Sequence, residues 1–162
     1  MLNIRNTAIV LSLSIASAVT YAQDTSVLNP QLINAMSTAA HDEARKLGVD
    51  ISFSVVDEKG WPVFFQRYDN AMLLTTVLVP KKAYTSAITR MPSGALEKLT
   101  APGAPLYGIN TADPKLILIA GGYPLTYKGK VVGALGVGGG SWEQDEQMGQ
   151  AALKAFKTVV EK

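Results

Sequence analysis

The only histidine in the 162-residue sequence, His41, and Tyr123 are the two better candidates for ligating iron, with the methionines behind them. A neutral imidazole nitrogen coordinates transition metals, and Tyr123 could do so as a phenolate. Cysteine is absent, which excludes thiolate metal sites and cysteine nucleophiles, and a single histidine excludes the usual zinc sites with several histidines. The alternative for both residues is structural: a solvated histidine on a helix and an ordinary surface tyrosine.

Two glycine-rich segments and one lysine could position a ligand. Gly121 and Gly122 lack side chains, so a ligand or another segment of chain could approach the backbone there. The glycine-rich segment from Gly133 to Ser141 precedes a predicted helix, and its successive N–H groups could form a nest for an anion; the alternative is a tight turn from strand to helix. Lys82 could neutralise a carboxylate. The acidic residues 143–146 could bind a hard cation, although acids in a first helical turn also complement the helix dipole.

Periodicity and turn residues predict the elements that hold these side chains. In the first half we expect a helix from Pro30 to Leu47 ended by Gly48, a hairpin of strands Asp50–Asp57 and Trp61–Tyr68, a helix within Thr75–Arg90, and a short helix from Ser93 to Leu99. Pro62, near the start of its strand, favours an edge or strand-end position. Pro80 would start or kink the Lys82 helix, and Ser93 would cap the short one.

The second half begins with a long loop over Thr100–Pro114, because three prolines and two glycines preclude regular structure. We then expect a buried strand at Leu116–Ala120, a hairpin of Pro124–Tyr127 with Lys130–Val137, and a helix from Ser141 to about Val160 with a Ser141–Gln144 capping box. Tight hairpins imply antiparallel pairing. The fold class expected is α/β (α+β), with a central antiparallel sheet flanked by helices.

The N-terminal 22 residues have the layout of a secretory signal peptide. Arg5 is followed by a short apolar run over residues 8–19, and small residues precede a cut after Ala22. This run is too short to span a bilayer, so we expect a periplasmic or secreted mature domain, residues 23–162, without a stable membrane span. The net charge is only +2 and no basic stripe is present, so we expect no nucleic-acid partner.

A cluster of apolar residues beside Pro80 predicts a homo-oligomer. Its members are Met72, Leu73, Leu74, Val77 and Leu78. A patch of this kind is a liability on the surface of a small monomer.

An ordered set of motifs resembles the GlcG/HbpS family, which includes the C-terminal domain of PduO proteins. The set comprises Val55-Val56-Asp57 with Gly60, Arg67, Lys82-Ala83-Tyr84-Thr85, Gly121-Gly122-Tyr123-Pro124-Leu125, Gly129, Val132-Gly133, Gly136-Val137, Gly139-Gly140 and Glu143-Gln144-Asp145-Glu146. The resemblance runs from about Ile33 to Phe156. It implies a profilin-like fold, homo-oligomers and, in some members, haem binding.

The resemblance also implies roles for particular residues. A histidine on the first helix ligates haem in some relatives, and His41 matches it; a threonine does so in others. Tyr123 is the second choice on chemical grounds, because its glycine neighbours leave room for a flat ligand. Lys82 matches the lysine of the family and would pair with a haem propionate. We therefore expect a haem site where the first helix, the Lys82 helix and the Gly121–Gly122 turn meet, with Tyr84, Leu106 and Tyr107 as apolar walls.

Three functions are compatible with the sequence. The first is an exported haem-binding protein that stores, carries or senses haem. The second is an oligomeric binding module for another small ligand, a carboxylic acid or a corrinoid. The third is a haem-degrading enzyme, for which the sequence offers no dedicated acid–base pair and no nucleophile elbow beside His41.

Overall fold

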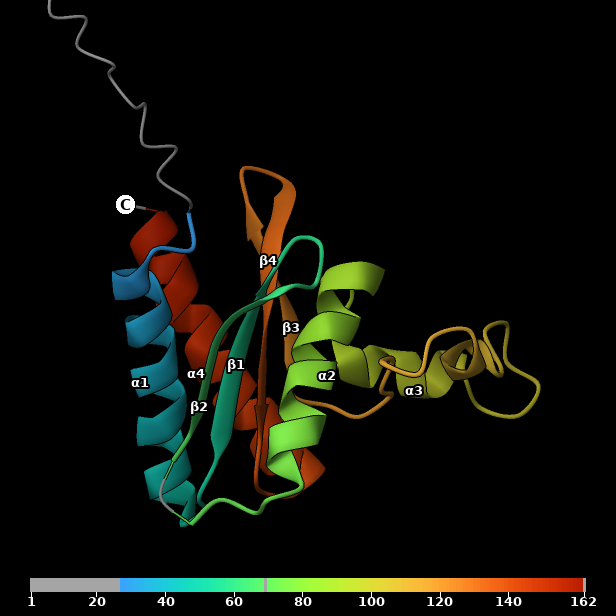
Figure 1. Cartoon of the computed structure of the whole chain (residues 1–162), viewed down its shortest axis with the longest axis horizontal. Helices are drawn as coiled ribbons and strands as arrows, with labels where there is room; N and C mark the ends of the chain where they lie inside the picture. Colours follow the sequence, from blue (N-terminus) through green and yellow to red (C-terminus); the bar gives the residue numbers. More distant parts are fainter. Residues whose placement is uncertain (1–26, 69, 162) are drawn as a thin grey trace, which may run out of the picture.

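A four-stranded antiparallel sheet, in the order β2-β1-β4-β3, lies between helices on both of its faces (Figure 1). The computed structural model describes residues 27–68 and 70–161, so the predicted signal peptide at residues 1–22 lies outside the described residues. The sheet and its flanking helices confirm the expected α+β fold class.

The order of elements along the chain agrees with the prediction at all but one segment. The elements are α1 (Pro30–Leu47), β1 (Ser52–Asp57), β2 (Pro62–Arg67), α2 (Thr75–Thr89), the 3-10 turn η1 (Ser93–Ala95), α3 (Leu96–Leu99), the 3-10 turn η2 (Ile109–Thr111), β3 (Gly122–Tyr127), β4 (Lys130–Gly138) and α4 (Trp142–Val160). The predicted edge position of the Pro62 strand is confirmed, since β2 is the first strand of the sheet.

The expected strand at Leu116–Ala120 is wrong. This segment has no regular structure and is only partly buried. Two of its backbone groups bond to side chains instead of a neighbouring strand. The Ile117 N–H donates to Thr85 Oγ1 at 2.9 Å, and the Ile119 carbonyl accepts from Ser93 Oγ at 2.6 Å. Ser93 therefore ties this segment to η1 and does not cap the short helix.

The helix ends follow local signals in the sequence. Asn29 caps α1 by accepting from the Leu32 N–H at 2.9 Å, and Gly48 ends it in a left-handed conformation with φ 69°. The predicted capping box of Ser141 and Gln144 starts α4. Pro80 lies inside α2, beyond its first turn, so it does not start that helix.

The two faces of the sheet are packed differently. On one face, α1 and α4 bury a large apolar core that includes Met36, Phe53, Met148 and Phe156. On the other face, α2 meets the sheet through a smaller cluster of Val56, Ala83, Ala87 and Ala134. Figure 1 shows α1 and α4 on one side of the sheet and α2 on the opposite side. The small side chains allow α2 to lie close to the strands.

Two paired glycines set this close approach. Gly122 of β3 lies opposite Gly136 of β4. A Cβ at Gly122 would lie 2.3 Å from the Lys82 carbonyl oxygen, and a Cβ at Gly136 would lie 2.4 Å from the Val79 carbonyl oxygen. The backbone that approaches Gly122 is therefore that of α2 in the same chain.

The apolar cluster beside Pro80 is exposed, as the predicted homo-oligomer requires. Leu73 is 74% exposed and Met72 is 60% exposed. We expect the purified mature protein to elute above the monomer mass in size-exclusion chromatography with light scattering. The Leu73→Glu/Val77→Glu variant should be a monomer, because two charges at an apolar interface are costly to bury.

Val159→Glu is the matched control, since Val159 is 45% exposed on α4, on the other side of the sheet. Its elution should equal that of the wild type. A wild-type monomer at micromolar concentration would contradict the prediction. In the described part of the chain, no helix has the length and apolar character needed to cross a bilayer.

Candidate functional site

The predicted site residues do not converge on one place. His41 lies on α1 and Lys82 lies on α2, which pack on opposite faces of the sheet. The expectation that the first helix, the Lys82 helix and the Gly121–Gly122 turn meet is therefore wrong within one chain. The sheet itself separates the two helices. Lys82 and the two glycines do lie together, and they form the centre of a buried polar network.

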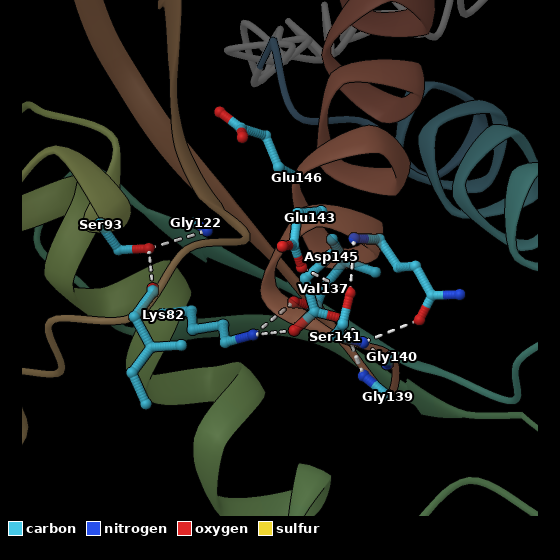
Figure 2. A network of polar contacts seen from close by, with 12 residues as sticks. Lys82, Ser93, Gly122, Val137, Gly139, Gly140, Ser141, Glu143, Asp145 and Glu146 are labelled. Atoms are coloured by element: carbon cyan, nitrogen blue, oxygen red, sulfur yellow. Dashed lines mark hydrogen bonds and ion pairs between the residues drawn. The ribbon is translucent and has the colours of Figure 1, made fainter.

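Lys82 forms a buried ion pair with Asp145, at the start of α4. The Lys82 Nζ lies 2.5 Å from Asp145 Oδ2 and donates to the Val137 carbonyl oxygen at 3.1 Å. Lys82 is 2% exposed and Asp145 is 4% exposed. Figure 2 shows the ammonium extending from α2 to both partners. With its charge already balanced, Lys82 is poorly suited to the expected role of neutralising a haem propionate.

The predicted anion nest binds a carboxylate of its own chain. Asp145 Oδ1 accepts from the backbone N–H groups of Gly139 at 3.1 Å and Gly140 at 3.0 Å. Asp145 thus holds the place that an external anion would take. The sequence alone predicts for Asp145 only a role in complementing the helix dipole or in binding a cation. Within the described residues, no group of three or more metal-ligating side chains is present.

Burial and charge act on Asp145 in opposite directions. Removal from water raises the pKa of the Asp145 carboxyl above its ordinary value. The Lys82 ammonium and the two glycine N–H groups act against this shift, because they stabilise the ionised form. Each partner therefore depends on the other, because either one alone would be a buried charge without a counter-charge.

Glycines make room for the ion pair on both sides. A Cβ at Gly121 would lie 3.1 Å from Lys82 Nζ, and a Cβ at Gly138 would lie 3.0 Å from it. Gly121 also has φ 110°, a conformation that L side chains rarely adopt. Ser93 fixes the adjacent turn by accepting from the Gly122 N–H at 2.9 Å. The glycine motifs thus serve the buried Lys82–Asp145 pair.

A small pocket opens beside this pair. It has a volume of about 230 Å³, with Lys82, Asp145 and the glycines 138–140 on its polar side and Leu78, Val79 and Trp142 among its apolar residues. It borders the exposed cluster that includes Met72 and Leu74.

Tyr123 lies on the other face of the sheet from Gly122, as alternation along β3 requires. It is 4% exposed and packs in the core shared by α1 and α4, with its ring against Gly149. Its hydroxyl donates to the Glu146 carbonyl at 3.5 Å. Burial raises the pKa of Tyr123 to about 12, with a smaller contribution from the charge of Glu146. The phenolate that iron requires is therefore disfavoured.

His41 is half-buried on α1, and its ring stacks on Tyr68 with centroids 4.0 Å apart and planes 12° apart. The Tyr68 hydroxyl forms a 2.7 Å hydrogen bond with Ser37 one turn earlier on α1. Arg45, four residues after His41, is exposed. The expected apolar walls lie elsewhere: Tyr84 is on α2, and Leu106 and Tyr107 belong to the long loop.

Comparisons with known proteins give one consistent family. Residues 28–154 match the family described as "Haem degrading protein HbpS-like". The corrinoid adenosyltransferase PduO of Salmonella typhimurium is 35% identical over 125 residues, which are 76% of this chain and 37% of that protein. This chain thus spans little more than a third of that relative.

Two solved structures share the fold. The structure described as the PduOC:heme complex has a TM-score of 0.76 and 34% identity, and the match covers 79% of this chain and 94% of that one. The structure of HbpS has a TM-score of 0.71 and 26% identity, and the match covers 98% and 99% of the two chains.

Proposed function

Since this chain belongs to the HbpS-like family, we propose that it is an exported haem-binding protein that carries, stores or senses haem. The observation that carries the proposal is its likeness, over most of the domain, to a relative whose structure is a haem complex. The resemblance in sequence had implied the same ligand. Of the candidates for the iron ligand, we favour His41.

His41 fits an iron ligand better than Tyr123 does. His41 is half-buried on α1, whereas Tyr123 is 4% exposed and packs in the core. The raised pKa of Tyr123 adds to this difference, because a protonated phenol is a poor ligand for ferric iron. Tyr68 supplies an aromatic ring beside His41, and exposed Arg45 is a candidate partner for a propionate.

A haem held by His41 would leave much porphyrin surface in water on a single copy. We infer that a second copy covers it. Haem binding would then stabilise the assembly as well as the fold, because a ligand that spans two copies favours their association.

Titration of the purified mature protein with haemin tests this function. We expect a saturable Soret band in the wild type. His41→Ala should shift or abolish that band, because iron loses its nitrogen ligand. Tyr123→Phe is the matched control and should leave the spectrum unchanged. If both variants bind haemin with the wild-type spectrum, the ligand assignment is wrong. If the wild type shows no saturable binding, the function is wrong.

Export gives a separate prediction. The apolar run before Ala22 and the small residues beside it should direct cleavage there. Mass spectrometry of the protein from a periplasmic or secreted fraction should find the N-terminus at or close to Gln23. Intact Met1 in that fraction would contradict the cleavage.

The alternative functions make different predictions in the same assay. A binding module for a corrinoid should bind cobalamin in preference to haemin, a possibility raised by the likeness to PduO. A haem-degrading enzyme should lose the Soret band over time when a reductant and oxygen are supplied, whereas a carrier or sensor should retain it.

A further inference from the structure

A second pocket lies on the α2 face of the sheet, across the sheet from His41. It has a volume of about 470 Å³ and lies between the β1–β2 hairpin and α2. Ser54 and Val56 of β1 contribute to it, and both are almost fully buried. Its lining is largely apolar, which is typical of sites that bind small organic molecules.

Three aromatic side chains line this pocket. Trp61 is 66% exposed and Phe65 is 42% exposed, while Tyr84 of α2 is half-buried. A Cβ at Gly60 would lie 2.7 Å from the Tyr84 ring, so this turn glycine allows the ring to pack against the hairpin. Flat aromatic surfaces favour a flat ligand, because offset or edge-to-face contacts between rings add to the burial of apolar area.

Two lysines line the same pocket. Lys81 Nζ donates to the Pro114 carbonyl oxygen at 3.0 Å, and Lys115 Nζ lies 5.2 Å from the centroid of the Tyr84 ring. An ammonium has three donors, so the one hydrogen bond of Lys81 leaves capacity for a ligand. Asp113 is the nearby counter-charge and accepts from the Tyr84 hydroxyl at 2.6 Å. The lining itself holds these two ammonium groups and no carboxylate; Asp113 and Asp57, whose Oδ1 accepts from the Trp61 N–H at 2.8 Å, lie beside it.

The pocket lacks a suitable donor for iron. Its lining residues include neither histidine nor methionine. The Tyr84 hydroxyl is already bonded to Asp113, which raises the pKa of Tyr84 and keeps the phenol protonated. The lining therefore suits an organic anion better than a metal-bearing cofactor.

We propose that this pocket binds a planar apolar carboxylate, with its ring against Trp61, Phe65 and Tyr84 and its carboxylate on Lys81 and Lys115. The geometry provides both parts of such a ligand with a complementary surface: aromatic walls for the ring and a pair of cations for the charge. This site is separate from His41 and does not depend on haem binding.

The ring nitrogen of Trp61 reports on this site in an ¹H–¹⁵N correlation spectrum. The chain has two tryptophans, and Trp142 lines a different pocket, so its signal is an internal control. The probe is 2-naphthoate, and 2-naphthalenemethanol is the matched neutral compound. We expect a saturable shift of the Trp61 signal with naphthoate, an unmoved Trp142 signal, and affinity for the alcohol that is about tenfold lower.

Variants test whether naphthoate binds in this pocket and independently of His41. Lys81→Gln/Lys115→Gln should weaken naphthoate binding about tenfold. Lys128→Gln, at an exposed turn, and His41→Ala should not change it. Equal affinities for the acid and the alcohol, or the loss of binding in His41→Ala, would overturn the proposal. A Trp61 signal that does not shift with naphthoate but shifts when the protein is diluted would also overturn it, since a second copy would then occupy the pocket.

Discussion

Lys82→Met should lower the free energy of unfolding by about 3 kcal/mol or more, as is typical when one partner of a buried ion pair is removed. The methionine keeps the length of the side chain but removes the ammonium. Asp145 then keeps only the N–H groups of Gly139 and Gly140 as partners in a site that is 4% exposed. Chemical denaturation followed by circular dichroism measures the change.

The loss of unfolding free energy caused by Lys82→Met should depend on pH. Burial already raises the pKa of Asp145, and removal of the ammonium that opposes this shift should raise it further in the folded protein. The folded variant then binds the proton more tightly than the unfolded chain does. Its stability is therefore greatest below the unfolded pKa and falls as pH rises through the folded pKa, so the deficit should be larger at neutral pH than at about pH 4.

Two further variants make the test specific to the pair. Asp145→Asn should be similarly destabilising, because it leaves the Lys82 ammonium buried without a counter-charge. The double variant should lose less than the sum of the two single changes. Lys46→Met is the control: its partner is Glu43 on the helix surface, and its effect should be much smaller. Single changes no larger than this control would contradict the prediction.

Local signals explain which parts of the fold the sequence predicted. Pro30 and Gly48 bound α1, and the Ser141–Gln144 capping box starts α4, because these signals act within a few residues of the helix end. The hairpins likewise follow from turn residues between short β-rich runs. In each hairpin the two paired strands are adjacent in the sequence, with Ser52 opposite Arg67 in one and Tyr127 opposite Lys130 in the other. No contact between distant parts of the chain is needed to predict them.

Long-range contacts explain what the sequence did not predict. The apolar run at Leu116–Ala120 is typical of a buried strand, but Thr85 and Ser93 bind its backbone from α2 and η1. Asp145 was missed because acids in a first helical turn are usually solvated. The available signal was its position, a few residues after a run of glycines whose N–H groups require an acceptor.

The same distinction applies to the candidate site. Side-chain chemistry is enough to select His41, Tyr123 and Lys82 as candidates. The face of the sheet on which each lies depends on strand register and helix packing. A helix with a cation could have packed on either side of the sheet. The small residues Ala83 and Ala87, with Gly122 and Gly136 opposite, are what place α2 on the face away from His41.

Gly136→Ala should therefore destabilise the protein by about 3 kcal/mol, at the upper end of the range for overpacked cores. The added Cβ would lie 2.4 Å from the Val79 carbonyl oxygen and 2.8 Å from the Ala83 nitrogen. Both atoms belong to the backbone of α2, so no side-chain rotation relieves the clash and the helix must move away from β4. That movement would also separate Lys82 from its partners across the same interface.

Gly103→Ala is the control for this substitution. A Cβ at Gly103 would have no atom within 4 Å. Because φ is 83° there, this variant should show only the conformational cost of an alanine in the left-handed region, about 1 kcal/mol. Ala83→Gly added to Gly136→Ala should not restore stability, because the closest clash is with the Val79 carbonyl. Denaturation curves of the three variants test this directly. A Gly136→Ala protein as stable as Gly103→Ala would show that α2 does not depend on the glycine pair for its position.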